Sequence, residues 1–300
     1  MAAKKTTETQ EKITEKKPAA KKPAAKKTSR PRAKKPEMPR ILFASAEVNP
    51  FSQTGGLGEV AGSLPVAVNA SGEAVMAVVT PLYECIGQEW RKDFEFICHI
   101  NVPVAWRSQY AGLFKFVYRG VTHYFIDNEY YFKRPNLYGY YDDAERFAFF
   151  TRAVLELMPH MDFRPNILHS NDWHTALVPI YYKLYYMRAA GYEGIQNLIT
   201  IHNIEYQGKY DGYLLEDVFG ISGFEYYTLE WGGCVNLLYG AIAYSDMVST
   251  VSRTYAQELR GAAHACGLEN AIDRYAYKLT GIVNGIDTEV YNPETVPALF

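Results

Sequence analysis

The sequence predicts an α/β fold, with a doubly wound, mostly parallel sheet and helices on both of its faces. Two observations support this prediction. From Arg40 onward, short runs rich in β-branched residues alternate with helical patterns, and such alternation is typical of parallel strands joined by crossover helices. In addition, polar segments follow several of the strand-like runs, as expected where parallel strands end at the ligand-binding edge of a sheet.

The elements follow from these patterns in order along the chain. The β-branched and apolar runs predict strands at 41–47, 75–80, 94–102, 114–118, 121–127, 166–170, 197–202, 247–251 and 280–283. Apolar residues at helical spacing predict helices at 57–70, 142–158, 174–188, 232–244 and 252–260. The runs 114–118 and 121–127 are separated only by Arg119 and Gly120, which predicts a hairpin inserted into the parallel layer.

The first 40 residues differ from the rest of the chain in charge. They hold 14 lysines and arginines and 4 acidic residues, a net charge of +10, and they contain the sequence KKPAA twice. The remaining 260 residues carry a net charge of −12. Since Lys, Ala, Pro and Thr cannot form an apolar core, we expect residues 1–38 to be a disordered basic tail and residues 39–300 to be the folded domain. A solvated extension is the favoured interpretation of the tail, and nucleic-acid binding is the alternative.

Cysteine usage and hydropathy exclude several classes of protein. Cys85, Cys98, Cys234 and Cys266 are isolated, without CxxC spacing, and the seven histidines show no paired spacing. We therefore expect neither disulfides nor a metal site, and we expect a cytoplasmic protein. No apolar run is long enough to span a bilayer, and the tail fits neither a signal peptide nor a transit peptide.

A glycine-rich turn follows the first expected strand. The sequence Gln53-Thr-Gly-Gly-Leu-Gly58 leads directly into the expected helix 57–70. A helix that begins on glycines presents unpaired N–H groups and the positive end of its dipole, which suits a phosphate group. However, glycines at such turns are more often needed for steric reasons, and this turn does not match GxGxxG. A dehydrogenase-like or epimerase-like module that binds a dinucleotide is therefore not favoured.

A second polar segment, His169-Ser-Asn-Asp-Trp-His174, follows the expected strand 166–170. Polar, aromatic and ionisable groups are concentrated here at the end of a strand, which favours a binding cleft. Asp172 has an alternative interpretation, because its side chain could cap the following helix. His174 falls in the first turn of that helix and could face either the core or the cleft.

Two more polar segments follow later strands. His202 ends a strand and is followed by Asn203, Tyr206 and Gln207, whose side chains hydrogen-bond well to sugar hydroxyls. A single histidine at a strand end is more often structural, so this segment leaves both interpretations open. The last segment, 283–287, contains an Asn-Gly pair, which by default indicates a turn.

Taken together, the four segments and their surroundings carry a family resemblance that spans residues 40 to about 293. The similar stretches are ILFASAEVNPFSQTGGLGEVAGSLP, YYFKRPNLYGYYDDAERFAFFTRAVLE, HSNDWHTALVPIYYK, TIHNIEYQG, AYSDMVSTVS and GIVNGIDTEVYNP. They resemble the starch and glycogen synthases, retaining glycosyltransferases of the GT-B fold. The resemblance implies a Rossmann-like domain that forms the N-terminal half of that fold. It also implies ADP-glucose and an α-1,4-glucan as substrates, with no cofactor.

The resemblance implies a role for individual residues. As catalytic residues it implies His202, which would contact the transferred glucose, and Asp172. For binding of the donor ADP-glucose it implies Gln53, Thr54, Gly55, Gly56, Glu59 and Asn284. For the sugar and glucan cleft it implies His174, Asn203, Tyr206, Gln207 and Tyr138.

Three residues depart from the family pattern. Gln53 stands where the family carries a lysine that contacts ADP-glucose, Glu59 replaces the usual aspartate, and Tyr239 replaces a usual lysine. A hydrogen bond to a charged partner contributes about 1.5–3 kcal/mol. The change at Gln53 alone therefore predicts that donor binding is weakened by about tenfold or more.

In the family, a second nucleotide-binding domain follows the segment at 283–287, and we expect this chain to lack it. That domain stabilises the leaving ADP, so glucose transfer by this chain alone is expected to be weak or absent. Two hypotheses remain. The chain is either a synthase completed by a second domain or by another chain that carries it, or a catalytically silent partner that binds glucan or regulates a full-length synthase.

Overall fold

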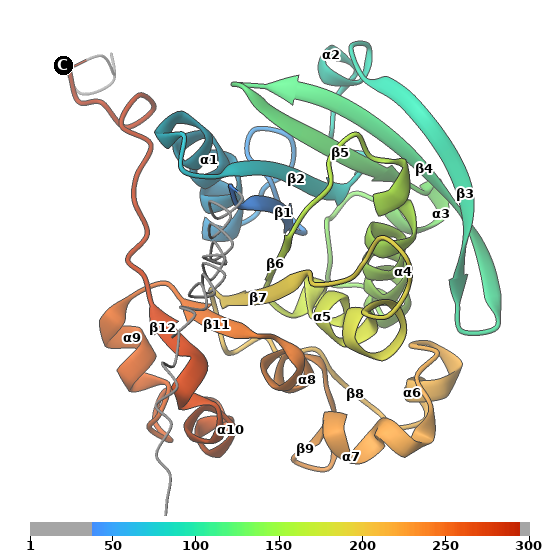
Figure 1. Ribbon diagram of the computed structural model, residues 1–300, viewed down its shortest axis with the longest axis vertical. Helices are drawn as coiled ribbons and strands as arrows, with labels where there is room; N and C mark the ends of the chain where they lie inside the picture. Colours follow the sequence, from blue (N-terminus) through green and yellow to red (C-terminus); the bar gives the residue numbers. More distant parts are fainter. Residues whose placement is uncertain (1–37, 295–300) are drawn as a thin grey trace, which may run out of the picture. The chain divides into compact units, whose positions relative to one another are not determined.

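The computed structural model describes residues 38–294, so the basic tail expected at 1–38 lies almost entirely outside the described residues. The described part is built on a nine-stranded sheet with the strand order β12-β11-β7-β6-β1-β2-β5-β4-β3 (Figure 1). The strands are β1 (Arg40–Ala44), β2 (Val75–Pro81), β3 (Glu95–Val104), β4 (Arg107–Tyr118), β5 (Val121–Asp127), β6 (Ile167–Asn171), β7 (Gln196–Ile201), β11 (Met247–Thr250) and β12 (Leu279–Gly281). Strands β12 to β5 in this order pair in parallel, which confirms the predicted fold class.

Strand β4 runs antiparallel to both of its neighbours, β3 and β5. The predicted hairpin between β4 and β5 is confirmed, and its turn residues Arg119 and Gly120 both have positive φ angles, 47° and 74°. The prediction placed the start of β4 seven residues too late, at 114 instead of 107. Residues 107–110 are Arg, Ser, Gln and Tyr, all exposed or half-buried, so they lack the apolar run that marks the rest of the strand.

Helices cover both faces of the sheet. Helix α1 lies on one side, α4, α5 and α8 lie on the other, and α9 packs beside β11 and β12 (Figure 1). The helices are α1 (Gly56–Ser71), α2 (Gln88–Arg91), α3 (Glu129–Phe132), α4 (Asp143–Leu157), α5 (Leu177–Tyr181), α6 (Leu214–Asp217), α7 (Tyr226–Leu229), α8 (Leu237–Tyr244), α9 (Arg253–Glu258) and α10 (Glu269–Arg274). Helix α4 is buried along most of its length, because aromatic and aliphatic side chains occupy nine of its fifteen positions.

Two predicted helices differ from the structure. The region predicted at 174–188 consists of a 3₁₀ turn (Trp173–Thr175), helix α5 and a π-helical turn (Tyr182–Tyr186). Apolar spacing does not distinguish these geometries, because they differ by only one residue per hydrogen-bonded turn.

The helix predicted at 232–244 begins only at Leu237. Gly232 and Gly233 have positive φ angles and form the turn of a small sheet that was not predicted, with strands β8 (Lys209–Tyr210), β9 (Glu230–Trp231) and β10 (Cys234–Asn236). The Asn236 side chain then accepts from the Tyr239 N–H and caps α8, which fixes its start.

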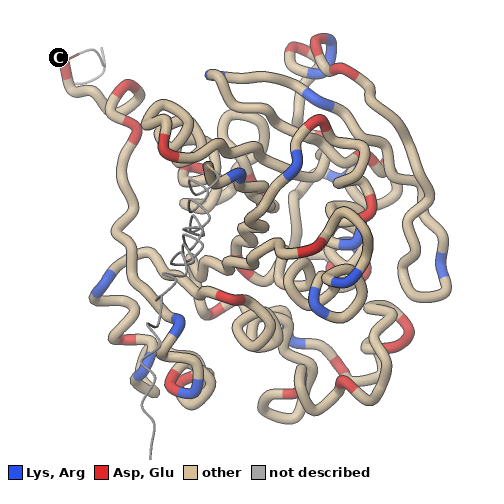
Figure 2. The backbone as a smooth tube through the Cα atoms, in the orientation of Figure 1, with Lys and Arg blue, Asp and Glu red and all other residues tan. Residues whose placement is uncertain are grey.

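Lysines and arginines are interspersed with acidic residues along the described backbone (Figure 2). Only the first 40 residues carry a net positive charge, +10, and the other 260 are net acidic, at −12. None of the described helices is long and apolar enough to cross a membrane. All four cysteines are free thiols in the structure.

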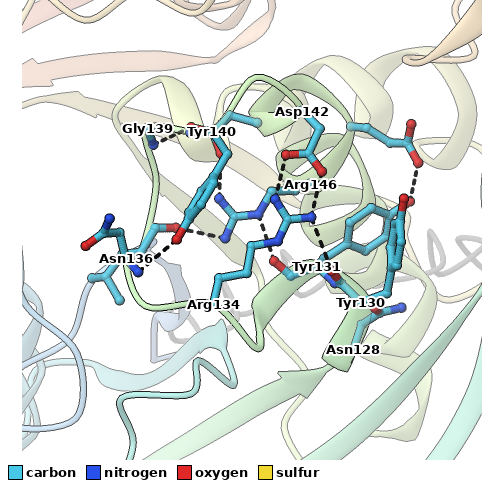
Figure 3. A network of polar contacts seen from close by, with 12 residues as sticks. Asn128, Tyr130, Tyr131, Arg134, Asn136, Gly139, Tyr140, Asp142 and Arg146 are labelled. Carbon is cyan, nitrogen blue, oxygen red and sulfur yellow. Dashed lines mark hydrogen bonds and ion pairs between the residues drawn. The ribbon is translucent and has the colours of Figure 1, made fainter.

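The loop between α3 and α4, residues 133–142, is held by two arginines (Figure 3). Arg134 forms a two-point ion pair with Asp142, at 2.6 and 2.7 Å. The guanidinium groups of Arg134 and Arg146 both pack on the Tyr140 ring, each 4.9 Å from its centroid. Planar guanidinium groups stack favourably on aromatic rings, so the loop is fixed through Tyr140.

Arg146 is completely buried and supplies the inner half of this network. Its side chain donates to the main-chain carbonyls of Tyr131 and Leu137, at 2.8 and 3.0 Å, and pairs with Asp143 at 2.5 Å. The other Asp143 oxygen accepts from two N–H groups of the loop. Because every one of these bonds ends on the loop or its flanks, Arg146 sets the position of Tyr138 at the sheet edge.

We predict that Arg146→Met lowers the free energy of unfolding by about 3–5 kcal/mol, because it leaves the Asp143 carboxylate buried without its cation. Arg134→Met breaks the ion pair with Asp142, which is less buried, so it should lower the free energy of unfolding by less than Arg146→Met does. Arg260 is the matched control: its pair with Asp273 is more than half exposed, so Arg260→Met should cost at most about 1 kcal/mol. Denaturant unfolding of the three variants measures this order, and equal losses for Arg146→Met and Arg260→Met would contradict it.

Candidate functional site

A cavity of about 510 Å³ lies at the edge of the sheet where the parallel strands end. Its wall combines the turn before α1, the loop between α3 and α4, and the segments that follow β6, β7 and β12. Of the residues expected at the site from the sequence, it includes Gly55, Gly56, Tyr138, Asp172, His174, His202, Asn203, Tyr206 and Asn284. Segments far apart in the sequence meet here because the carboxyl ends of parallel strands share one edge.

Glu47 lies in the wall of this cavity, and the sequence analysis missed it. Its carboxylate accepts from the N–H groups of Thr54 and Gly55, at 2.7 and 2.9 Å, and from the Thr54 hydroxyl at 2.8 Å. It also accepts from the Tyr138 hydroxyl at 2.6 Å. The one available signal was an acidic residue at the end of an otherwise apolar run.

The ionisation of Glu47 depends on these contacts. Burial opposes the charge, but the hydrogen bonds from Thr54, Tyr138 and Gly55 outweigh burial and hold the pKa of Glu47 below its usual value. Burial and the contact with Glu47 raise the pKa of Tyr138 to about 12, so the tyrosine remains a donor. The glycine turn and the Tyr138 loop are thus joined through one buried carboxylate.

Helix α1 begins at the cavity. No side chain caps it at Gly55, and within the described residues the N–H groups of Gly56 and Leu57 have no protein partner. The N–H groups of Thr54 and Gly55, which the sequence analysis expected to be open, point to Glu47 instead. The open donors of this turn are therefore those of the first helical residues, at the positive end of the helix dipole.

Gln53 and Glu59 lie outside the cavity wall and contact each other. The Gln53 side-chain amide donates to Glu59 at 2.8 Å, and Asn49 donates to both, at 2.6 and 3.1 Å. These two departures from the family pattern are thus in direct contact. Thr54 is also outside the wall, and its hydroxyl and N–H are bonded to Glu47. These three residues, expected at the donor site, are thus not among those that line the cavity.

Tyr239, the third departure from the family pattern, is not part of the cavity wall. It is buried, its ring centroid lies 4.7 Å from that of Trp231, and its hydroxyl accepts from Arg274 at 3.3 Å. Replacing the usual lysine by tyrosine therefore changes the packing of α8 and not the described cavity.

Asp172 does not cap a helix, and this alternative was wrong. Its backbone has a positive φ of 55°, no N–H of the following turn bonds to its side chain, and its carboxylate reaches across to β7. There it accepts from the N–H groups of His202 and Asn203, at 2.7 and 3.4 Å. Burial raises the pKa of Asp172 to about 7, against the lowering effect of these two bonds. A carboxyl group with this pKa exchanges a proton near neutral pH.

The two histidines in the cavity are neutral. Burial lowers the pKa of His202 to about 4 and that of His174 to about 3. His202 contacts the Asn171 side-chain oxygen through Nε2 at 2.9 Å, a partner that the sequence analysis missed. His174 packs against the rings of Tyr138, Phe147 and Trp173, with centroids 4.7, 4.7 and 4.2 Å away.

Both ring nitrogens of His174 are buried without a hydrogen-bond partner in the described structure. A buried polar atom without a partner costs about 1–3 kcal/mol. His174 also lies in the lining of the cavity, one of the two orientations left open by the sequence.

Fewer residues of the segment after β7 line the cavity than the sequence analysis expected. Tyr206 and Asn203 are exposed and line the cavity. Gln207 is buried away from it, where its amide donates to the carbonyls of Ile204 and Cys266 and accepts from Asn236. Gln207, expected on the cleft wall, does not line this cavity, because both N–H groups and the oxygen of its amide are bonded within the packed segment.

The described residues contain no cluster of histidine, cysteine and acidic side chains that could hold a metal ion. What the cavity offers chemically is the ionised carboxylate of Glu47, the Asp143 carboxylate that pairs with Arg146, a titratable carboxyl group at Asp172, two neutral imidazoles and an open helix N-terminus. This set suits a ligand that carries both an anionic group and hydroxyl groups.

Comparison with known proteins gives consistent matches. A family model described as the starch synthase catalytic domain matches residues 40–274. A glycogen synthase from Streptococcus pneumoniae serotype 2 (strain D39) is 46% identical over 259 residues, which cover 85% of this chain and 54% of that protein. A glycogen synthase from Clostridium kluyveri is 43% identical over 263 residues, which cover 87% of this chain and 55% of that protein.

A solved structure, the catalytic domain of starch synthase IV from Arabidopsis thaliana bound to ADP and acarbose, is similar with a TM-score of 0.77. It is 32% identical in sequence, and the match covers 87% of this chain and 54% of that one. The chain thus spans about half the length of the relatives that it matches. The relatives are synthases by name, which does not favour a catalytically silent partner. The chain belongs to the family of starch synthase catalytic domains.

Proposed function

We propose that the cavity takes part in the transfer of glucose from ADP-glucose to the end of an α-1,4-glucan, in the synthesis of glycogen or starch. The observation that carries this proposal is the pairing, in one cavity wall, of the open N-terminus of α1 with His174 and its two unpartnered ring nitrogens. The helix N-terminus suits the diphosphate, and neutral imidazole suits the sugar hydroxyls. The names of the relatives, and the ADP and acarbose bound to the Arabidopsis protein, support the same substrates.

In this proposal the transferred glucose lies between the helix N-terminus and the two histidines. Gly55, Gly56 and Asn284 contact the donor, and His202 and Asp172 contact the reacting sugar. The glucan occupies the part of the cavity lined by His174, Tyr138, Asn203 and Tyr206. Gln53, Thr54 and Glu59 act indirectly, by holding the turn that carries the open N–H groups.

The reaction breaks the bond between the anomeric carbon and the β-phosphate oxygen, and the bonding electrons leave with ADP. The 4-hydroxyl oxygen at the glucan end forms the new bond to the anomeric carbon, and its proton passes to the departing phosphate or to solvent. Positive charge develops on the sugar meanwhile, so the ionised Glu47 in the cavity wall favours the transition state. The N–H groups of α1 favour the negative charge that develops on the phosphate.

We also propose that residues 39–300 form the N-terminal half of a GT-B fold and supply only one wall of the complete cleft. A second nucleotide-binding domain would supply the cations that stabilise ADP, whether it belongs to the same protein or to another chain. The half-length match to the relatives supports this proposal. We propose a cytoplasmic location, in line with the bacterial relatives, and we assign no nucleic-acid partner.

Gly56 provides a direct test of the proposed diphosphate site. A Cβ at this position would have no atom within 4 Å, so Gly56→Asn and Gly56→Asp both fit sterically. An aspartate at a helix N-terminus stabilises the helix but repels a diphosphate. We expect wild type and Gly56→Asn to bind ADP-glucose weakly, with Kd of about 1 mM, and Gly56→Asp to bind at least about tenfold more weakly.

Ligand-observed NMR at two salt concentrations measures these affinities, and the difference between the Asn and Asp variants should shrink as salt rises. Melting temperatures of the two variants serve as the folding control. If Gly56→Asp bound ADP-glucose as well as Gly56→Asn does, the start of α1 would not be the diphosphate site.

A second test concerns catalysis by this chain alone. We expect no detectable incorporation of labelled glucose from ADP-glucose into glycogen, because the charge on the departing ADP is stabilised from one side only. Strong incorporation that is abolished by His202→Ala would contradict the proposal of half a cleft. It would mean that this chain assembles a complete donor site without a second domain.

A further inference from the structure

Asn171 is the last residue of β6, and its side chain is completely buried. Strand β6 lies between β1 and β7, and the side chain reaches the end of each of these neighbours. Its nitrogen Nδ2 donates to the main-chain carbonyl of Ala44, the last residue of β1, at 3.0 Å. Its oxygen Oδ1 lies 2.9 Å from Nε2 of His202, the residue that follows β7. Asn171 thus connects the ring of His202 to the sheet.

The two ends of the Asn171 amide are distinguished by their surroundings. Nδ2 faces two main-chain carbonyls, that of Ala44 and, at 3.4 Å, that of His169. A carbonyl oxygen only accepts hydrogen bonds, so an amide rotated by half a turn would set Oδ1 against two other acceptors. Such a contact is costly in a site that water does not reach. The Asn171 oxygen is therefore the end that faces His202.

This orientation determines which nitrogen of His202 carries the proton. Because an amide oxygen only accepts, Nε2 must donate to it. Burial lowers the pKa of His202 to about 4, so at neutral pH the ring is neutral and has a single N–H group. With that proton on Nε2, Nδ1 is an acceptor without a proton. Among the hydrogen bonds of the described residues, none involves Nδ1 of His202.

His202 is held at its main chain as well as at its ring. Its N–H group donates to Asp172 at 2.7 Å, so two consecutive residues fix the same histidine. His202 borders two cavities, and Asn171 lines only the second of them, which has a volume of about 490 Å³. Since Nε2 faces Asn171, the ring edge that carries Nδ1 points away from it. Nδ1 is therefore left for a ligand in the cavity that also contains Asp172 and His174.

We propose that Asn171 is a positioning residue for the transfer reaction: it fixes His202 in the tautomer with the proton on Nε2, so that Nδ1 accepts a hydrogen bond from a hydroxyl group of the transferred glucose. The proposal rests on the proposed function, which places the sugar beside His202. A sugar hydroxyl donates to Nδ1, whereas an ionised phosphate oxygen has no proton to donate. The tautomer therefore favours the glucose of the donor over its diphosphate at this position.

The tautomer is measured directly by NMR of the full chain labelled with ¹⁵N-histidine, since a protonated ring nitrogen resonates far upfield of a bare one. Comparison with His202→Ala identifies the signals of His202. At neutral pH we expect wild type to carry the proton on Nε2 alone, with slow exchange of this proton. Asn171→Leu removes the acceptor, so it should give a mixture of both tautomers with fast exchange.

Asn197→Leu is the matched control, because Asn197 is also a buried asparagine of the sheet and its amide has no hydrogen-bond partner in the part of the chain that the structure describes. It should leave the tautomer of His202 as in wild type. A wild-type proton on Nδ1 would overturn the proposal, and this result needs no variant to fold. The wild-type tautomer and slow exchange in Asn171→Leu would overturn it equally.

Ligand-observed NMR separates this role from a purely structural one. Asn171→Leu should weaken the binding of ADP-glucose by about three- to tenfold, the effect of one hydrogen bond, and leave the binding of ADP unchanged because ADP has no glucose. Equal losses for the two ligands would contradict the proposal. Its failure is distinguishable from failure of the diphosphate site: the tautomer is measured without ligand, whereas the comparison of Gly56→Asp with Gly56→Asn tests the start of α1.

Discussion

The arrangement of the cavity at the sheet edge depends on the buried carboxylate of Glu47. Its hydrogen bonds join the turn before α1 to the loop that carries Tyr138, through Thr54, Gly55 and the Tyr138 hydroxyl. A buried charge is stable only when its hydrogen bonds replace those of water, and here four donors do so. The same bonds leave the next N–H groups of α1 unpaired. The Glu47 carboxylate thus accepts from the N–H groups of Thr54 and Gly55, and the N–H groups of Gly56 and Leu57, which line the cavity, stay without a partner.

The other features of the cavity follow from burial at the edge of a parallel sheet. His174 and His202 are neutral because little solvent reaches them, whereas Asp172 is difficult to ionise for the same reason. Two carboxylates of the cavity wall carry charge: Glu47, and Asp143, which is paired with Arg146. Arg146 itself lies behind the wall and fixes the loop from which Tyr138 reaches Glu47. The charge at the cavity is thus set within its wall, and its geometry by a residue behind the wall.

The sheet and the site edge could be predicted from sequence because both follow from local patterns. The alternation of strand-like runs with helical patterns predicted a mostly parallel sheet. The polar segments after the strands indicated the sheet edge at which their side chains would meet. Which side chains face the cavity was not predictable in this way. Gln207 and Tyr206 are neighbours with similar polarity, yet only Tyr206 lines it. Glu47 was missed because its partners, seven to ninety-one residues away, become visible only in the folded chain.

The account depends most directly on Glu47 holding the turn before α1. Hydrogen exchange of the Thr54 and Gly55 amides, in wild type and in Glu47→Ala, measures this, with the Gly72 amide at the other end of α1 as control. Both amides donate to the same Glu47 oxygen, which a glutamine could replace, whereas alanine removes every acceptor. The account predicts slow exchange at Thr54 and Gly55 in wild type, fast exchange in Glu47→Ala, and no change at Gly72. Equal exchange at Thr54 and Gly55 in the two proteins would contradict it.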